Sequence, residues 1–285
     1  MSVVLAERLK PVSDKVAEAW GIAINESLRS AASTDPTPFA LKFLDTLPNP
    51  NGHGGLVAFL GSGFGRDALY FVERGYDVAA YELVPLGREI TRRRFEERGL
   101  AHRLKIGNDF HDTSGLAPKS LDGALAVQSL NYLAPDEFVE VLSMYKRHVK
   151  DDGLFAIVSR FKDSDTSPRN PLSNPKRYSV PADVFRMQTI DPESTIPDKQ
   201  DEYAFAFDMP ISDRGGTATN PILRTWVYTG NQLRIIAKVA GYEVIDALPW
   251  FIDNPRLGMA DVHIYVLLKP KTQINSGAPV KPKSL

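Results

Sequence analysis

Three glycines stand at alternate positions in the segment FLGSGFGRD, residues 59–67: Gly61, Gly63 and Gly65. The apolar run LVAFL precedes them, and the helix-like run DALYFVERG follows. Glycines in a strand-to-helix turn let a ligand approach the backbone closely, and the helix N-terminus offers N–H groups and partial positive charge. We therefore predict that this loop, with Ser62 inside it, contacts a bound ligand.

The spacing of the glycines departs from one common nucleotide motif, and the residues that follow them exclude another. The dinucleotide fingerprint requires Gly-x-Gly-x-x-Gly, and Arg66 occupies its sixth place here. No Gly-Lys-Ser/Thr follows the loop, so it is not a Walker phosphate loop. The ligand must therefore be identified by other residues.

Two acids stand where a nucleoside would need them. Glu82 ends the second apolar run, YDVAAYE, and an acid there can accept hydrogen bonds from both ribose hydroxyls. Asp109 follows the third run, RLKIG, where it could accept from an adenine amino group, with Phe110 packing on the ring. Each acid alone has an ordinary explanation, a surface charge for Glu82 and an Asx turn for Asp109. Together with the glycines they favour a nucleoside ligand.

The elements that must position these residues alternate along the chain. Five apolar runs, expected as strands, alternate with amphipathic helices, and a further helix–strand pair and a last strand follow near the C-terminus; the runs are LVAFL, YDVAAYE, RLKIG, LDGALAVQSL and GLFAIVSR. Strands that are apolar nearly throughout indicate a parallel sheet covered on both faces. We expect an N-terminal helix over residues 12–28 and another that begins near Thr34 or Asp35.

Residues 160–228 break this pattern, because they are rich in proline and polar residues. We interpret them as an insertion over the carboxyl edge of the sheet, the edge at which open α/β sheets bind ligands. Within it, the alternating run YAFAFDM and the run PILRTWVY are expected to pair as strands. The predicted organisation is N-terminal helices covering the site (1–48), a main domain (49–268) with the insertion as a substrate lid, and a disordered tail (269–285).

Composition narrows the classes of function. The formal net charge is −1, which gives no electrostatic reason to expect nucleic acid or an anionic membrane as partner. The chain has no cysteine, so disulfides, thiolate zinc sites and a cysteine nucleophile are excluded. No histidine pair has metal-ligand spacing, and no metal is expected. We see neither a signal peptide nor a membrane-spanning run and expect a cytoplasmic protein; the sequence leaves a homodimer open.

The segment PTPFALKFLDTLP…VAFLGSGFGRDALYFVERGYDVAAYE resembles the class I S-adenosylmethionine-dependent methyltransferases, nearest the tellurite-resistance and thiopurine types. The segments LDGALAVQSLNYLAPDEFVEVLSMYKRHVKDDGLFAIVSR and YTGNQLRIIAKVAGYEVID are similar to later units of that family. The resemblance covers residues 36–268. It implies a Rossmann-like, seven-stranded, mostly parallel α/β sheet with helices on both faces and the last strand antiparallel.

The resemblance also assigns roles. Gly61, Gly63 and Gly65 would admit the methionine and ribose parts of S-adenosyl-L-methionine, and Glu82 would hold the ribose. Leu83, Asp109 and Phe110 would surround the adenine, and Gln128 would lie near the sulfonium. One position departs from the family, which commonly has an acid two residues before the first glycine, where this chain has Phe59.

The implied reaction is in-line methyl transfer to a small-molecule acceptor with a sulfur, oxygen or nitrogen nucleophile. Tyr132 and His111 are the candidate catalytic residues; Tyr132 and its neighbour Asn131 stand after the fourth strand, and His111 is next to Asp112. Three alternatives stay open: a relative that uses the same cofactor for another reaction, a non-catalytic binding or assembly module, and, less favoured by the loop spacing, a nicotinamide-dependent oxidoreductase.

Overall fold

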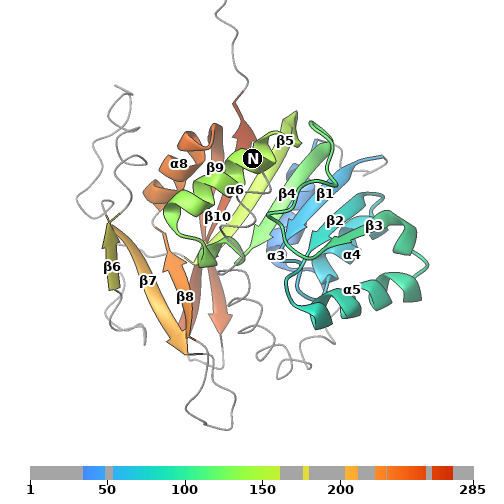
Figure 1. Ribbon diagram of the computed structural model, residues 1–285, viewed down its shortest axis with the longest axis horizontal. Helices are drawn as coiled ribbons and strands as arrows, with labels where there is room; N and C mark the ends of the chain where they lie inside the picture. The colour runs from blue at the N-terminus through green and yellow to red at the C-terminus, as the bar shows by residue number, and fades with distance from the viewer. Residues whose placement is uncertain are drawn as a thin grey trace, which may run out of the picture.

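The computed structural model describes residues 35–48, 54–160, 176–179, 203–210, 222–228, 230–254 and 259–271. Within these ranges, seven strands form one sheet in the order β3-β2-β1-β4-β5-β10-β9 (Figure 1). The strands β1 to β5 pair with one another in parallel, and β10 is antiparallel to both β5 and β9. The expected Rossmann-like fold with an antiparallel last strand is therefore confirmed.

The first half of the sheet follows the apolar runs of the sequence. Its elements are β1 (Leu56–Leu60), α4 (Arg66–Glu73), β2 (Asp77–Tyr81), α5 (Pro85–Glu97), η1 (Ala101–Arg103) and β3 (Leu104–Gly107). Strand β1 is central: it pairs with β2 on one side and β4 on the other, and four of its five residues are buried. The chain order reverses between β1 and β4, which makes the carboxyl end of these strands the ligand-binding edge of such a sheet.

The second half adds the switch-point strand and the antiparallel edge. Its elements are β4 (Leu121–Val127), η2 (Leu130–Tyr132), α6 (Pro135–Lys146), β5 (Val149–Arg160), α8 (Gly230–Val239), β9 (Tyr242–Asn254) and β10 (Met259–Pro270). Strand β10 continues to Pro270, which pairs with Tyr242, so the strand extends past the boundary predicted at residue 268.

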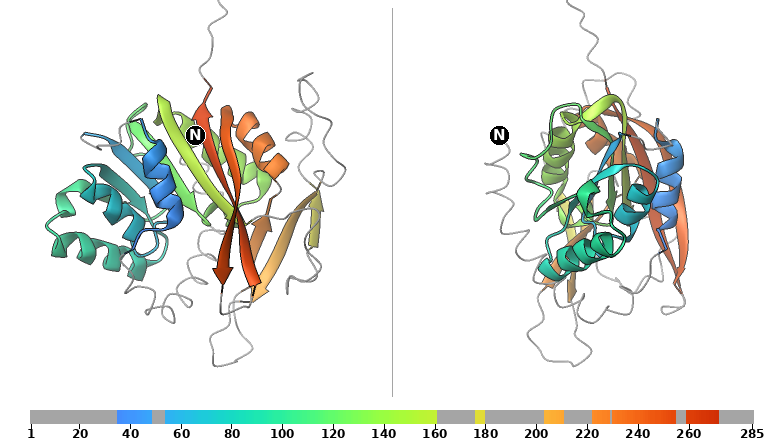
Figure 2. Two further views of the ribbon diagram at one scale, coloured as in Figure 1. Left: turned by 180° about the vertical axis from the view of Figure 1, so that it is seen from behind. Right: turned by 90° about the vertical axis from the view of Figure 1, so that its right-hand side faces the viewer.

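Helices cover both faces of the sheet, as the apolar strands require. Helices α6 and α8 pack on one face with a cluster that includes Phe138, Leu142 and Ile236. On the other face α4 packs together with α3 (Pro38–Thr46), and Phe43 and Phe71 are fully buried there. The edge-on view in Figure 2 shows α6 and α3 on opposite sides of the sheet.

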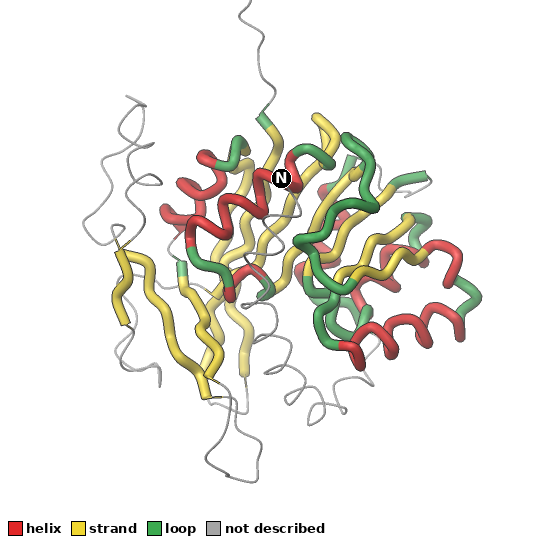
Figure 3. The backbone as a smooth tube through the Cα atoms, in the orientation of Figure 1, coloured by secondary structure: helices red, strands yellow, loops and turns green. Residues whose placement is uncertain are grey.

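A second, three-stranded antiparallel sheet forms within the insertion. It contains β6 (Lys176–Ser179), β7 (Tyr203–Pro210) and β8 (Ile222–Val227), in that order (Figure 3). The predicted pairing of YAFAFDM with PILRTWVY is confirmed, with Phe205 opposite Val227. Strand β8 lies against η2 and β5, and the next residue, Tyr228, is fully buried and donates from its hydroxyl to the carbonyl of Leu133 at 2.6 Å.

Two expectations about the N-terminal region have different outcomes. The predicted helix over residues 12–28 lies outside the described residues. Helix α3 begins later than expected: its N-cap is Thr37, whose hydroxyl accepts from the N–H of Ala40 at 3.1 Å, and Pro38 occupies the first turn. Proline fits there because the first helical N–H groups have no partner within the helix. Among the described residues no helix is long and apolar enough to cross a membrane.

Candidate functional site

The glycine loop connects β1 to α4, and its three glycines all have left-handed backbone angles, with φ of 74°, 57° and 73°. Gly61 and Gly65 also pack tightly. A Cβ on Gly61 would lie 2.6 Å from Cβ of Ser129, and one on Gly65 would lie 2.5 Å from Cγ2 of Thr91. A Cβ on Gly63 would meet nothing within 4 Å. Of the three, Gly63 is therefore the position where the loop leaves open space for a ligand.

The loop is tied to the end of β2. The N–H groups of Gly61 and Ser62 both donate to the carbonyl of Tyr81, at 2.9 and 2.8 Å. The next residue, Glu82, is 8% exposed, and its carboxylate accepts from the N–H of Gly63 at 2.8 Å and from the N–H of Val84 at 2.8 Å. Glu82 thus orients the loop at the one glycine that opens to a ligand.

Burial raises the pKa of Glu82, and the hydrogen bonds from Val84 and Gly63 oppose that shift. Each carboxylate oxygen has two acceptor directions, so these backbone bonds leave acceptor capacity for the two hydroxyls of a ribose. Leu83 follows, and the carbonyls of Glu82 and Leu83 both accept from the guanidinium of Arg88 at 2.7 Å.

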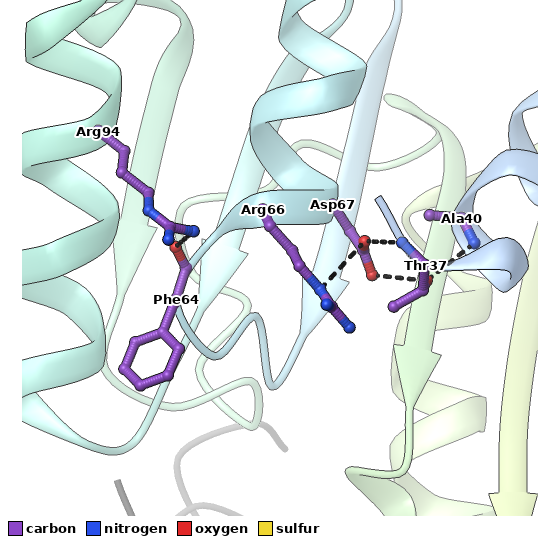
Figure 4. Close-up of polar contacts among 6 residues, drawn as sticks. All are labelled: Thr37, Ala40, Phe64, Arg66, Asp67 and Arg94. Carbon is purple, nitrogen blue, oxygen red and sulfur yellow. Dashed lines mark hydrogen bonds and ion pairs between the residues drawn. The ribbon is translucent and has the colours of Figure 1, made fainter. Parts of the chain in front are cut away.

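Helix α5 holds the other side of the loop, which the sequence did not predict. Its run RRRFEERG is highly charged, yet Arg94 is 8% exposed and Phe95 is fully buried. Arg94 donates to the carbonyl of Phe64 at 3.0 Å (Figure 4). Gly87 lets α5 approach, because a Cβ there would lie 2.9 Å from Cγ of Glu82 and 3.0 Å from the carbonyl of Gly63.

Helix α3 is fastened to the start of α4 beside the loop. The Asp67 carboxylate accepts from the N–H and the hydroxyl of Thr37, at 2.7 and 2.9 Å (Figure 4). Burial raises the pKa of Asp67, and the bonds from Thr37 oppose that shift. Two residues before Gly61, Phe59 is 3% exposed and packs edge-on against Phe71, with ring centroids 5.1 Å apart. Phe59 is therefore a core residue here.

Asp109 lies at the same edge as Glu82, because the N–H of Glu82 donates to the carbonyl of Gly107 at 3.2 Å. Its carboxylate oxygen Oδ1 accepts from the N–H of His111 at 2.9 Å, and Nδ1 of His111 lies 2.5 Å from the same oxygen. The orienting acid of His111 is therefore Asp109 and not the adjacent Asp112, which caps the N–H of Ser114 at 3.0 Å. Phe110 is 5% exposed, so it offers little of its ring to a ligand.

The segment after β4 brings further polar groups to this edge. Gln128 has a left-handed φ of 54°, which is uncommon for a residue with a side chain, and its Nε2 lies 2.6 Å from Nε2 of His263 on β10. Asn131 is 2% exposed and accepts from the hydroxyl of Ser159 at 2.8 Å, so its side chain is directed into the protein. Tyr132 is half-buried.

Among the buried hydroxyl oxygens that have no hydrogen-bond partner in the described residues, two lie at this edge: Oγ of Ser62 in the glycine loop and Oγ of Ser129 after β4. Buried hydroxyls are normally paired, so an unpaired hydroxyl beside an open glycine fits a polar ligand that supplies the partner. The open space at Gly63, these two hydroxyls and the acids Glu82 and Asp109 therefore fit a nucleoside with an amino-acid group. In the part of the chain that the structure describes, no group of His, Asp or Glu has a metal-binding arrangement.

Sequence reasoning missed Thr37, Asp67, Arg94, Ser129 and His263. Asp67, at the first turn of α4, had a weak signal, since acids are favoured at helix N-termini. The others act through contacts between elements far apart in the chain, for which one sequence carries no periodic signal.

One family of known proteins matches the part of the chain that forms this edge of the sheet. Residues 59–157, which hold the glycine loop, Glu82, Asp109 and Gln128, match a protein family described as "Methyltransferase domain". No curated protein matches the chain.

Solved structures of several methyltransferases have a similar fold. The 1,6-didemethyltoxoflavin-N1-methyltransferase of Burkholderia thailandensis, with bound 1,6-didemethyltoxoflavin and S-adenosylhomocysteine, is 17% identical, with 90% of each chain covered and a TM-score of 0.53. An S-adenosylmethionine-dependent methyltransferase from Clostridium acetobutylicum is 15% identical, with 88% of this chain and 97% of that chain covered and a TM-score of 0.55. A glycopeptide N-methyltransferase complexed with S-adenosylmethionine is 17% identical, with 83% and 95% covered and a TM-score of 0.52. At these identities the likeness establishes the fold.

Proposed function

We propose that this chain is an S-adenosylmethionine-dependent methyltransferase that acts on a small-molecule acceptor. The observation that carries the proposal is the convergence, at one edge of the sheet, of the open position at Gly63 with the carboxylates of Glu82 and Asp109. The match of residues 59–157 to a methyltransferase domain and the cofactor-bound neighbours support S-adenosyl-L-methionine as the cofactor.

Each residue of the site has a part in holding this cofactor. Glu82 would accept hydrogen bonds from the ribose hydroxyls, and Asp109 would accept one from the adenine amino group. Leu83 would lie beside the adenine, and Phe110 would support Leu83's side of the site from the core. The backbone at Gly63 borders the ribose and methionine parts. The hydroxyls of Ser62 and Ser129 pair with the polar amino-acid end, in the region where other family members use the acid that Phe59 replaces. Gln128 would lie near the sulfonium.

The bound cofactor supplies an electrophilic methyl group. The protein's task is to hold the acceptor's nucleophile in line with that group and to exclude water, and such orientation contributes about 7–11 kcal/mol to lowering a barrier. Tyr132 is our candidate for contacting the acceptor, because it follows β4 at the ligand-binding edge. No general base is required if the acceptor is a thiolate.

We assign the acceptor side to the insertion over residues 160–228. Strand β8 lies against η2, and Tyr228 anchors the end of the insertion to Leu133. The net charge of −1 favours a small acceptor over nucleic acid. One structural neighbour is a methyltransferase with a bound small molecule, which supports the same class of acceptor.

The test is a transfer assay with methyl-labelled S-adenosylmethionine and a panel of thiols, phenols and amines. We expect label in at least one product together with stoichiometric S-adenosylhomocysteine, and we expect Glu82→Ala to reduce the rate at limiting cofactor. Binding of the cofactor without transfer to any class of acceptor would favour a different reaction of the same cofactor. Failure to bind it would overturn the proposal and favour a non-catalytic module.

A further inference from the structure

His111 is almost completely enclosed, with 1% of its surface exposed. It makes two contacts with one atom: its N–H donates to Oδ1 of Asp109 at 2.9 Å, and its Nδ1 lies 2.5 Å from that same oxygen. An ionised carboxylate only accepts hydrogen bonds, so Nδ1 carries the hydrogen in this contact. The other ring nitrogen, Nε2, has no hydrogen-bond partner among the described residues.

The surrounding loop fixes the histidine ring in place. The hydroxyl of Tyr145 on α6 donates to the carbonyl of Phe110 at 3.0 Å, and the N–H of Asp112 donates to the carbonyl of Asp109 at 3.1 Å. The rings of Phe110 and His111 are in contact, with centroids 4.4 Å apart and planes tilted by 44°. The turn that carries Asp109 is therefore pinned to the core, and His111 is the side chain in it that contacts the carboxylate.

The Asp109 side chain is 24% exposed, whereas that of His111 is 2% exposed. The pair thus has a buried end, the imidazole, and an accessible end, the carboxylate. A carboxylate held at one oxygen by two donors keeps a single orientation, and a hydrogen bond from a polar partner to a charged group contributes more than one between neutral groups.

We propose that His111 is a positioning residue, which holds the Asp109 carboxylate toward the exocyclic amino group of adenine and so determines that the site prefers adenine over a base without that group. This deepens the proposed function and rests on it. It replaces the catalytic role that we predicted for His111, because a general base must reach the substrate and this imidazole is buried behind Asp109.

The test compares two ligands, S-adenosylhomocysteine and S-inosylhomocysteine, which carries an oxygen in place of the amino group. We expect the wild-type chain to prefer S-adenosylhomocysteine. His111→Leu removes the ring donor. We expect it to weaken the binding of S-adenosylhomocysteine about tenfold while changing the affinity for S-inosylhomocysteine by less than about twofold. We therefore expect the preference for the adenine ligand to decrease when the histidine is replaced.

Two polar variants keep the test decisive if His111→Leu does not fold. In His111→Asn the amide nitrogen stands as many bonds from Cα as Nδ1 does, so it retains the donor and most of the preference. In His111→Gln the amide nitrogen takes the place of Nε2, so the preference is lost. His148→Leu is the matched control: His148 is also buried, bonds Thr113 and Ala117 of the same loop at 3.1 and 3.2 Å, and touches no proposed ligand group. We expect it to change both affinities equally.

Each remaining outcome separates the two proposals. If the wild-type chain binds neither ligand, the proposed function fails and this inference fails with it. If the wild type prefers adenine and His111→Leu and His111→Gln keep that preference, the proposed function stands and His111 has no positioning role. An equal loss for both ligands in the His111 variants would show a structural role alone, and would also overturn the inference.

Discussion

The three glycines of the loop illustrate how one residue type meets two needs. Gly61 and Gly65 are required by packing, since each has a neighbouring side chain within 2.6 Å of the place where its Cβ would stand. Gly63 has no such neighbour within 4 Å, and its N–H is held by Glu82. The residue that serves the ligand can therefore be separated experimentally from the residues that serve the fold.

We expect Gly63→Ala to fold, with a loss of about 1–2 kcal/mol in the free energy of unfolding because a side chain disfavours its left-handed φ. It should weaken the binding of S-adenosylhomocysteine by about tenfold or more, because the new methyl group occupies space that the ligand needs. Gly61→Ala should cost more stability, since its methyl group would lie 2.6 Å from Ser129. Urea unfolding and calorimetric titration measure both effects. Wild-type affinity in Gly63→Ala would remove this position from the site.

The acid Glu82 predicts a pH dependence of ligand binding. Burial raises its folded-state pKa, so its protonation on acidification begins at a higher pH than for an ordinary glutamate. The ionised form accepts the ribose hydroxyls; affinity for S-adenosylhomocysteine should therefore be full above that pKa and fall as the pH drops through it. The contribution of Glu82 to folding stability has the opposite pH dependence. Because its pKa is higher in the folded state, the folded state binds more protons than the unfolded state, and the stabilisation from this group decreases as pH rises.

The matched variant for this prediction is Glu82→Gln, which cannot ionise. Titrations between about pH 5 and pH 8 should give a weaker and flatter affinity profile for the variant than for the wild type. If the wild-type profile is as flat as that of Glu82→Gln, the carboxylate does not contact the ligand.

The sequence allowed us to predict those site residues that stand at the end of a strand or in the glycine loop. Glu82 and Asp109 stand at strand ends, and they do lie at one edge of the sheet. Contacts between side chains were not predictable. The contact of Asp109 with His111 depends on the local turn, and the contacts of Arg94 with Phe64 and of Gln128 with His263 join segments that are distant in the sequence. Which residues contact the cofactor remains a prediction.

At the scale of elements, the contact between Thr37 and Asp67 joins the N-terminus of α3 to the first turn of α4. We expect Asp67→Ala to lower the free energy of unfolding by about 1–3 kcal/mol, because two donors of Thr37 lose a charged acceptor in a largely buried place. Asp77→Ala is the control, since its ion pair with Arg103 has a 55% exposed carboxylate and should matter little. Equal stability of the two variants in urea unfolding would show that the contact does not hold α3.

Most boundaries of helices and strands were predictable, because they coincide with the ends of apolar runs and with the turn residues beside them. The run LVAFL is β1, α6 begins at Pro135, and Gly241 separates α8 from β9. Strand β9 continues through Pro249, which is paired with Ile264 inside the strand. Proline is tolerated because β9 is the edge strand, where an N–H facing away from the sheet needs no partner.

At the scale of the whole molecule, the order β3-β2-β1-β4-β5-β10-β9 places the glycine loop, the two acids and η2 at one edge of the sheet. The three-stranded sheet of the insertion meets that edge through β8 and Tyr228. Periodicity predicted the parallel sheet, and the family resemblance supplied the antiparallel last strand. The identity of the acceptor was not predictable, because it depends on side chains brought together by the insertion.

The most direct test of the proposed site is calorimetric titration of the purified full chain with S-adenosylmethionine and with S-adenosylhomocysteine, beside a nicotinamide dinucleotide as control. We predict that both sulfur nucleosides bind with dissociation constants of about micromolar order, with one site per chain, and that the dinucleotide does not bind. No heat of binding from either sulfur nucleoside at millimolar concentration, or binding of the dinucleotide instead, would contradict the assignment of this site to S-adenosylmethionine.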